Sequence, residues 1–296
     1  MRERLLLGPV LIAALVGGLW LDQRLQGVAG PWGHTLPPGV VIAPLMVLIA
    51  CLGAIELGVI LRARGVMAAR GVLTMGACLG LGVFMLPVGL GGTDQVAAVG
   101  AAATVALACS MAFYSRGQNV QGVVGATGGT LLAFVYLGLM FGLVLALRRE
   151  FTAWHVAWML LTVKSCDIGA YFTGKSIGRR KLIPWLSPGK TWEGLIGGVV
   201  FSTGVGCLGL WILSRYGLQA WAGMGWSLVP GFLFGIAGQA GDLLASLMKR
   251  DAGIKDSGRI LPGFGGVLDV VDSPILVAPL AFWWLKMMSE RVVEAI

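Results

Sequence analysis

The chain alternates long apolar runs with short polar connections. Each run approaches the roughly 20 residues that a helix needs to cross the hydrocarbon core of a bilayer. The runs predict nine membrane spans, at Leu5–Leu21, Gly39–Leu61, Gly71–Leu90, Val96–Tyr114, Val123–Leu147, Trp154–Tyr171, Leu195–Leu213, Leu228–Met248 and Val267–Met287. A β-barrel would instead show short segments of alternating polarity. The pattern therefore predicts an all-α, polytopic integral membrane protein with about nine transmembrane helices.

The predicted spans divide into about five before residue 150 and about four after it. We therefore expect an N-terminal transmembrane region over residues 1–150 and a C-terminal region with polar loops over 151–296. No repeat of fixed period is evident, and the only long polar connection is Gly174–Glu193. The first run follows charged residues, as in a signal peptide, but no small-residue cleavage site closes it before Asp22. We expect it to remain as a span.

Composition agrees with a membrane protein and excludes other classes. The 296 residues are 57% hydrophobic and 12% charged, with a mean hydropathy of +0.84, whereas a soluble domain carries about 25% charged residues. The net charge of +8 comes from Lys and Arg in short clusters between apolar runs. This arrangement favours anionic lipid headgroups or an anionic substrate over nucleic acid. The five cysteines are isolated, which argues against a disulfide framework or a zinc site.

The basic residues also predict the orientation of the chain in the membrane. With the N-terminus in the cytosol, cytosolic segments carry fifteen Lys and Arg, and the opposite side carries six. Cytosolic loops of membrane proteins are enriched in these residues. The connection 174–193 and the segment 251–264 are therefore expected on the cytosolic side. The pair Arg148-Arg149 falls on the opposite side and is the main exception.

Charged residues inside the apolar runs are candidates for function because each costs at least about 2.5–3.5 kcal/mol at the membrane centre. They are Glu56, Lys164, Asp167, Asp242, Asp269 and Asp272. Glu56 stands alone in its run. Both a hydrogen bond between helices and a catalytic role are open for it.

The last three of these charges belong to a denser pattern. Asp242, Ser246 and Lys249 are spaced to share one helix face, and Asp269 and Asp272 share a face of the next span. Carboxylates brought together in low dielectric repel one another, and a divalent cation relieves the repulsion. Oxygen ligands without His or Cys favour Mg²⁺ over zinc. A structural cluster of salt bridges is the alternative.

Two basic segments add chemistry that suits phosphate. One interleaves Lys249, Arg250 and Lys255 with serine and glycine, and such loops offer cations and backbone N–H groups to phosphate oxygens. The other contains Gly189-Lys190-Thr191, as in a nucleotide P-loop. Pro184 stands where a P-loop requires its first glycine, and no strand is expected before it, so a Walker fold is rejected. A loop for a nucleotide triphosphate and a basic loop on anionic lipid both remain open.

The polar segments of the C-terminal half resemble the phosphatidate cytidylyltransferase (CDP-diacylglycerol synthase) family. The resemblance runs through Ser246-x-Met248-Lys249-Arg250-x4-Lys255-Asp256-x-Gly258-x2-Leu261-Pro262-x-Phe264-Gly265-Gly266-Val267-x-Asp269-Val270-Val271-Asp272, a stretch of 27 residues. It includes Asp167-x-Gly-Ala-Tyr and Ser187-Pro188-Gly189-Lys190-Thr191-Trp192-Glu193-Gly194 upstream. The family usually has His where this chain has Phe264 and Arg where it has Val270.

The resemblance implies transfer of the cytidylyl group of CTP to phosphatidate, with Mg²⁺ and a possible second cation as cofactors. It places the catalytic residues in the region 151–296 and the active site on the cytoplasmic side of a bacterial inner membrane. Asp242 and Asp269 are then expected to hold the metal. The expected catalytic residues are Lys190, Ser246, Lys249, Arg250, Lys255 and Asp272. The expected nucleotide-binding residues are Asp167, Ser187, Gly189, Lys190 and Thr191.

Other functions compete with this interpretation. A secondary transporter also places charges at membrane depth, but the carboxylates gather at one end and no inverted repeat is found. A CDP-alcohol phosphotransferase would need an Asp-Gly dipeptide, which the chain lacks. The expected partners are CTP, phosphatidate and membrane lipids, without nucleic acid, and a homodimer is left open.

Overall fold

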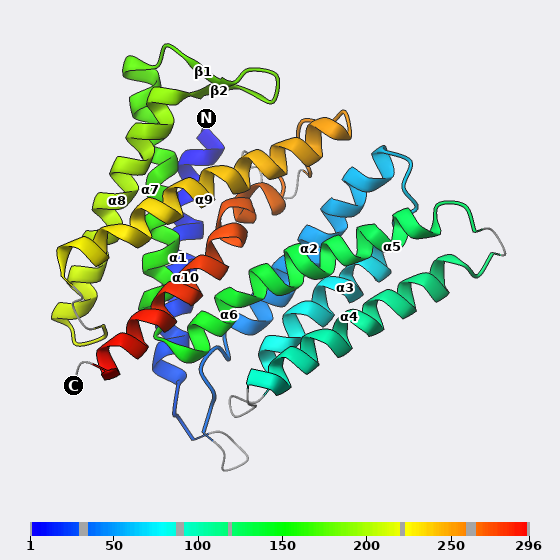
Figure 1. The fold of residues 1–296 in the computed structure, drawn as a ribbon, viewed down its shortest axis with the longest axis horizontal. Coiled ribbons are helices and arrows are strands. Elements are labelled where there is room, and N and C mark those ends of the chain that lie inside the picture. Colours follow the sequence, from blue (N-terminus) through cyan, green and yellow to red (C-terminus); the bar gives the residue numbers. More distant parts are fainter. Residues whose placement is uncertain are drawn as a thin grey trace. The chain divides into compact units, whose positions relative to one another are not determined.

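The protein is almost entirely helical in the computed structural model, which describes residues 2–29, 35–86, 92–117, 120–219, 223–258 and 265–294 (Figure 1). Its elements are α1 (Arg2–Leu25), α2 (Ile42–Ala63), α3 (Arg70–Gly82), η1 (Val83–Met85), α4 (Gly92–Tyr114), α5 (Val123–Leu132), η2 (Ala133–Met140), α6 (Phe141–Glu150), α7 (Ala153–Ile177), β1 (Lys181–Ile183), β2 (Ser187–Thr191), α8 (Trp192–Arg215), α9 (Met224–Asp251) and α10 (Leu268–Glu294). The predicted all-α class is confirmed, with one short hairpin added.

Every predicted span overlaps a helical segment of the described chain. The fifth span corresponds to α5, η2 and α6, which follow one another without a break over residues 123–150. Six described helices are long and apolar enough to cross a membrane, at Ile42–Ala63, Thr93–Tyr114, Val123–Glu150, Trp192–Arg215, Met224–Asp251 and Leu268–Glu290. The segment Arg70–Met85 is apolar but shorter. The chain is therefore an integral membrane protein, and the count of nine spans stays a prediction.

The helices form two compact units that interleave along the chain. The first unit contains Met1–Gly18, Gly39–Ala146 and Met248–Val271. The second contains Leu19–Pro38, Leu147–Leu247 and Asp272–Ile296. One boundary, at Ala146, lies close to the expected division at residue 150, but the end of α9 and the start of α10 belong to the first unit. A single cut of the chain therefore does not separate the two units.

In the first unit, small residues bring α3 against η2. A Cβ atom added to Gly80 would lie 2.8 Å from the Cα atom of Gly138, and one added to Gly138 would lie 2.7 Å from the Cα atom of Gly80. Real side chains do not fit at such distances, so the two backbones touch only because both positions are glycine. The π-helical turns of η2 lie at this contact. In Figure 1, α4 runs beside α5, and the two helices are in contact.

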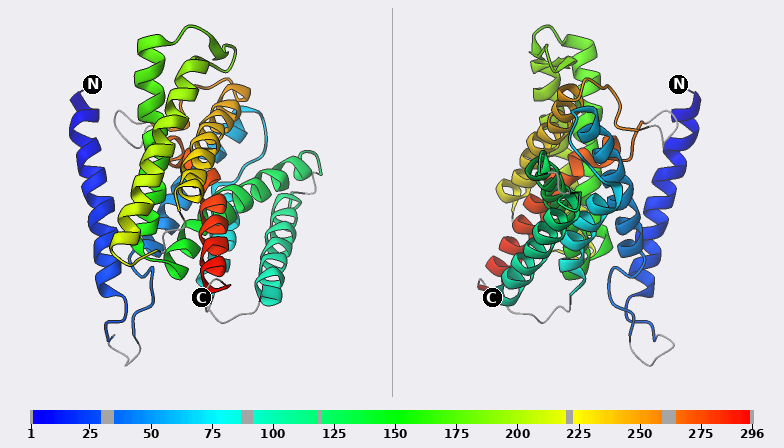
Figure 2. Two further views of the ribbon diagram at one scale, coloured as in Figure 1. Left: turned by 60° about the vertical axis from the view of Figure 1, so that its left-hand side comes forward. Right: turned by 90° about the vertical axis from the view of Figure 1, so that its right-hand side faces the viewer.

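In the second unit, α7 and α8 pack along their length, and the hairpin of β1 and β2 lies at the end where they meet (Figures 1 and 2). Gly169 and Gly198 lie at the contact between the two helices. The helix α9 approaches α8 at Gly231, and it approaches α10 at Gly241, where an added Cβ would lie 2.6 Å from the carbonyl oxygen of Asp272. Glycine thus sets how closely the polar residues next to these contacts come together.

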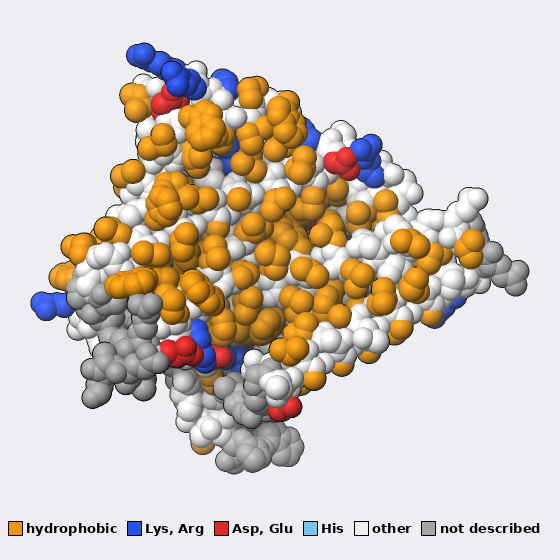
Figure 3. All heavy atoms as spheres, viewed as in Figure 1, with side chains coloured by type: hydrophobic (Ala, Val, Ile, Leu, Met, Phe, Trp, Pro, Cys, Tyr) orange, Lys and Arg blue, Asp and Glu red, His pale blue; other side chains and the backbone are white. Residues whose placement is uncertain are grey.

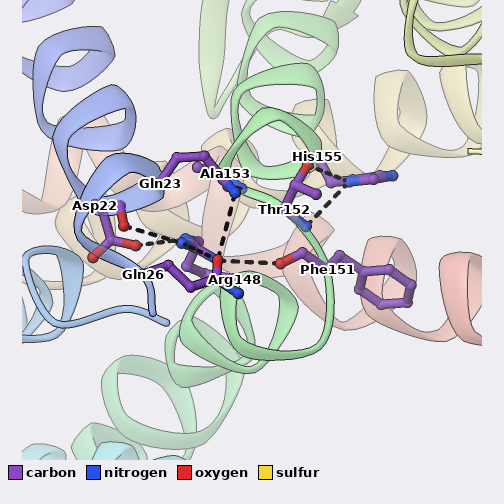
Figure 4. A network of polar contacts seen from close by, with 8 residues as sticks. All are labelled: Asp22, Gln23, Gln26, Arg148, Phe151, Thr152, Ala153 and His155. Atoms are coloured by element: carbon purple, nitrogen blue, oxygen red, sulfur yellow. Dashed lines mark hydrogen bonds and ion pairs between the residues drawn. The ribbon is translucent and has the colours of Figure 1, made fainter. Parts of the chain in front are cut away.

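A buried ion pair in the second unit joins α1 to the end of α6 (Figure 4). Arg148 Nε donates to Asp22 Oδ2 at 2.5 Å, and neither side chain is exposed. Arg148 also donates to the Gln26 amide oxygen at 3.1 Å and the Phe151 carbonyl oxygen at 3.2 Å. This pairing explains the exception in the basic-residue pattern, because the charge of Arg148 is balanced inside the unit and does not report the side of the membrane.

Hydrophobic side chains cover much of the molecular face in Figure 3, where Lys, Arg, Asp and Glu form only small groups. Among the exposed side chains are Val200 (66%), Leu161 (64%) and Ile196 (61%). A soluble monomer rarely exposes apolar surface so extensively. The exterior therefore agrees with helices that face lipid.

Candidate active site

A polar pocket of about 520 Å³ lies in the second unit where α7, α8, α9 and the hairpin meet. Its lining residues are Asp167, Ala170, Tyr171, Gly174, Lys175, Leu182, Gly189, Lys190, Thr191, Gly194, Leu195, Gln239 and Asp242. Four residues expected from the sequence to bind nucleotide or act in catalysis, together with one expected metal ligand, thus share one cavity. Lys175 adds a second ammonium group to its wall.

Lys190 is at the centre of this pocket. Its Nζ atom lies 2.7 Å from Asp242 Oδ2 and donates to Gln239 Oε1 at 2.9 Å. Gln239 Nε2 in turn donates to Asp167 Oδ1 at 2.9 Å, and Asp167 Oδ2 lies 3.4 Å from Lys164 Nζ. Side chains from β2, α9 and α7 therefore form one chain of alternating donors and acceptors.

Gln239 is a polar residue of this site that the sequence interpretation missed. It is 6% exposed and bridges Lys190 to Asp167. Its signal in the sequence is an amide within an apolar helix, one turn before Asp242 on the same face. Buried amides need hydrogen-bond partners, so an amide one helical turn from Asp242 indicates a polar site at this point of the helix.

The local fold around Lys190 differs from the expected long loop. The helix α7 continues to Ile177, and β2 then pairs antiparallel with β1, with Lys181 opposite Thr191 and Ile183 opposite Ser187. The expectation that no strand precedes Gly189-Lys190-Thr191 is wrong, because β1 comes before these residues, which themselves end β2 and lead directly into α8. A two-stranded antiparallel hairpin is still not a Walker fold. Ser187 lies at the start of β2 and does not line the pocket.

Thr191 caps α8. Its Oγ1 accepts a hydrogen bond from Gly194 N at 3.1 Å, and the side chain is 7% exposed. Glu193 meanwhile accepts hydrogen bonds from the backbone N–H groups of Arg179 and Arg180. These contacts hold the hairpin, which carries Lys190, on the start of α8.

We predict that Thr191→Ala lowers the free energy of unfolding by about 1 kcal/mol, the usual cost of losing a helix cap. Equilibrium unfolding of the purified protein in mixed detergent micelles measures this change. Thr191→Ser keeps the capping oxygen and is the matched control. A stability loss in the serine variant equal to that of the alanine variant would contradict the cap.

A second polar cluster lies in the first unit, at the start of α10. Lys249 Nζ donates to Asp269 Oδ1 at 2.5 Å, and Asp269 Oδ2 accepts from Gly266 N at 3.0 Å. Gly265 has φ +92°, and an added Cβ would lie 2.7 Å from Asp269 Oδ2. Glycine is required there both for the backbone conformation and for the approach of the carboxylate.

Glu56 is part of this first unit and is tied to the same segment. It is 2% exposed and accepts hydrogen bonds from Ser257 Oγ at 3.1 Å, Val267 N at 2.9 Å and Leu268 N at 2.8 Å. A Cβ added to Gly258 or Gly266 would meet the Glu56 carboxylate. Of the two alternatives for Glu56, the contacts favour hydrogen bonding: the carboxylate caps α10 and holds residues on both sides of 259–264.

The remaining expected residues occupy different settings. Asp272 is buried in the second unit and accepts hydrogen bonds from the backbone N–H and the hydroxyl of Ser273. Ser246 is half-buried on α9, whereas Arg250 and Lys255 are exposed. Val270 is half-buried on α10, and Phe264 lies outside the described residues.

The carboxylates of the second unit have the donor chemistry that Mg²⁺ prefers. Asp242 lies close enough to Asp167 and Asp272 for their like charges to repel. Its side chain is 37% exposed in the pocket, and it offers oxygen atoms with no His or Cys beside it. Within the described part of the chain, no three His, Cys, Asp or Glu residues lie close enough to bind one metal ion. The residues therefore fit a hard cation that takes only part of its oxygen ligands from the protein.

The pocket, lined by lysines and carboxylates on helices of which α8 and α9 are candidate membrane spans, is suited to hold phosphate groups. Comparison with known proteins places the chain in a family. The profile of the cytidylyltransferase family matches residues 32–288. The chain belongs to this family.

Individual relatives match about half of the chain. The chain is 37% identical over 164 residues to a phosphatidate cytidylyltransferase of Bacillus subtilis, covering 55% of this chain and 59% of the relative. It is 46% identical over 124 residues to a phosphatidate cytidylyltransferase of Synechocystis, covering 42% and 40%. An uncharacterized Escherichia coli protein, YnbB, is 45% identical over 132 residues, covering 44% and 42%. The chain thus spans about half the length of these curated relatives.

Proposed function

We propose that the protein transfers the cytidylyl group of CTP to phosphatidate, giving CDP-diacylglycerol and pyrophosphate. The observation that carries this proposal is the pocket in which Lys190 contacts both Asp242 and Gln239. Family membership and the names of the similar Bacillus and Synechocystis proteins support it. No observation on the described residues favours a transporter.

The chemistry of this reaction matches the residues of the pocket. A phosphate oxygen of phosphatidate attacks the α-phosphorus of CTP, and the bond to pyrophosphate breaks. The nucleophile is already anionic near neutral pH, so the reaction needs no strong general base. The obstacle is the repulsion between two polyanions, which cations and precise positioning overcome.

Individual roles follow from where the side chains lie. Lys190 and Lys175 neutralise phosphates in the pocket, and Gln239 orients the ammonium group of Lys190. Asp167 holds Gln239 in turn, so it shapes the nucleotide site without touching the reacting atoms. Lys249, Arg250 and Lys255 follow Asp242 along the chain, and we assign them to the same polyanionic substrates.

Mg²⁺ is the cofactor of this proposal, with Asp242 and Asp269 as its ligands and Asp272 and Ser246 as supporting residues. When bound, the ion supplies positive charge that balances the phosphates during displacement. In the structure each proposed ligand is paired with a lysine, Asp242 with Lys190 and Asp269 with Lys249. Binding a cation at Asp242 would free Lys190 for substrate.

Purified full-length protein, labelled CTP and phosphatidate test the proposal. We expect a labelled liponucleotide that forms with Mg²⁺, stops on chelation and returns when Mg²⁺ is added back. Turnover that is unchanged after exhaustive chelation would contradict the metal requirement. Unchanged CTP with several phosphatidates would contradict the reaction itself.

We also propose that the polar pocket faces the cytoplasm across a bacterial inner membrane. Single cysteines in a cysteine-free background test this orientation. Arg179 and Asp256 are exposed beside the two polar segments, and Thr93 is exposed near the start of α4. Gly178 and Ser257 are unsuitable probes because an added Cβ at Gly178 clashes and Ser257 is buried.

We predict that cysteines replacing Arg179 and Asp256 react with a membrane-impermeant thiol reagent only in inside-out vesicles. A cysteine replacing Thr93 should react only from the periplasmic side of intact cells with a permeabilised outer membrane. The mass shift of the purified protein measures the labelling. Reaction at Arg179 and Thr93 from the same side would contradict the predicted topology.

A further inference from the structure

We propose that an apolar groove between α8 and α9 holds an acyl chain of the phosphatidate. This inference rests on the proposed function and names the part of the protein that recognises the lipid portion of the substrate. The groove has a volume of about 630 Å³ and lies entirely in the second unit. Its lining residues are Leu195, Ile196, Val199, Val200, Thr203, Gly204, Leu228, Phe232 and Ile236.

The two helices form this groove by crossing closely at small residues. A Cβ added to Gly231 would lie 2.6 Å from the Ser202 carbonyl oxygen, and one added to Gly235 would meet the Ser202 side chain. Ser202 Oγ also donates to the Gly231 carbonyl oxygen at 2.9 Å. The backbones therefore touch along one line, and larger side chains beside that line form the walls of an open trough.

The walls are apolar and accessible from outside the protein. Along α9, Leu228, Phe232 and Ile236 recur every fourth residue and are 39%, 49% and 45% exposed. On α8, Ile196 and Val200 are 61% and 66% exposed. None of the described residues that line the groove is charged. Its lining helices are both candidate membrane spans, so the groove lies at membrane depth.

The groove adjoins the polar pocket. Leu195 lines both cavities, so the apolar groove and the pocket of Lys190 and Asp242 meet at this side chain. From Leu195 to Gly204 the helix rises by about 14 Å at 1.5 Å per residue. This length is close to one leaflet of the hydrocarbon core, which is about 15 Å.

An anionic lipid is the occupant that fits both parts at once. Its phosphate would meet the ammonium groups of Lys190 and Lys175, while its chain would run along α8 away from them. CTP does not fit the groove, because the groove offers its charges no partner. A neutral bilayer lipid fits the groove but has no charge for the two lysines, and a zwitterionic lipid offers them a phosphate diester whose charge is balanced by its own ammonium group. The phosphate monoester of phosphatidate therefore pairs best with Lys190 and Lys175.

Gly204 allows the groove to be filled without disturbing the helix. An added Cβ at Gly204 has no neighbouring atom within 4 Å, and the same is true of Gly225 on α9, which does not line the groove. Gly204→Leu and Gly225→Leu are therefore matched changes. We compare the KM for dioleoyl phosphatidate with the KM for dihexanoyl phosphatidate in both variants.

We expect the ratio of the KM for the long-chain lipid to the KM for the short-chain lipid to rise about tenfold in Gly204→Leu. This is the loss of affinity expected when one or two methylene groups of the acyl chain lose their apolar contacts. The ratio in Gly225→Leu should equal that of the natural protein. Equal ratios in the two variants would overturn the proposal.

Photolabelling separates this proposal from the proposed reaction, because it needs no turnover. Phosphatidate with a diazirine in its acyl chain should label peptides containing residues 195–204 or 228–236 of the natural protein. Excess unlabelled phosphatidate should prevent the labelling, and excess phosphatidylcholine should not. Equal competition by phosphatidylcholine would assign the groove to bulk bilayer lipid and overturn the inference. Labelling as expected without CTP turnover would keep the lipid site and reject the reaction.

Discussion

Asp242→Asn is expected to reduce the turnover of CTP and phosphatidate by about a hundredfold or more, the usual scale for losing one charge that acts on the reacting groups. The change conserves shape and removes the charge that pairs with Lys190 at 2.7 Å in the polar pocket. It also removes one proposed Mg²⁺ ligand. Initial rates of liponucleotide formation at saturating substrate measure the effect.

A matched control lies on the same helix. Asp251 ends α9 and pairs with Arg64, with both side chains 56% exposed. Exposed ion pairs contribute little, so Asp251→Asn should keep turnover close to that of the natural protein. Near-normal activity of Asp242→Asn, in protein that elutes and unfolds like the control, would contradict the proposed role of Asp242.

Glu56→Ala is expected to lower the free energy of unfolding by about 3–5 kcal/mol, because three donors lose their acceptor inside the protein. Those donors are Ser257 Oγ, Val267 N and Leu268 N. Equilibrium unfolding in mixed detergent micelles measures the change. Turnover should fall as well, since the start of α10 carries Asp269.

The control for Glu56 is another glutamate with one exposed partner. Glu150 pairs with Lys286, and their side chains are 26% and 48% exposed. Glu150→Ala should therefore cost less than about 1 kcal/mol. If Glu56→Ala and Glu150→Ala destabilise the protein equally, Glu56 does not hold α10 and the preceding segment as described.

The helices and the main candidate charges were predictable from the sequence alone. Apolar runs of span length leave little choice of secondary structure, because lipid offers backbone groups no other partner. Charges within such runs are costly, and this cost alone identified Asp167, Asp242 and Glu56. The helix boundaries moved by several residues, as for α9, which begins at Met224 rather than Leu228.

The partners of those charges were not predictable from spacing. Lys190 meets Asp242 because a hairpin turns β2 onto the start of α8, and the polar sequence of that segment was interpreted as a loop. Glu56 finds its partners about 200 residues further along the chain. Contacts of this kind depend on how closely the helices pack. Glycines such as Gly198 and Gly241 allow close packing, but a sequence pattern does not encode the resulting distances.

The most direct test of the central claim measures which phosphate of CTP enters the lipid. Purified full-length protein is incubated with phosphatidate, Mg²⁺ and CTP labelled either at the α-phosphate or at the γ-phosphate. Cytidylyl transfer predicts that α-label enters the lipid phase in equal amount to the pyrophosphate released, and that Asp242→Asn lowers the rate of both by about a hundredfold or more. Label from the γ-phosphate in the lipid, or no label from either position, would contradict the proposed reaction.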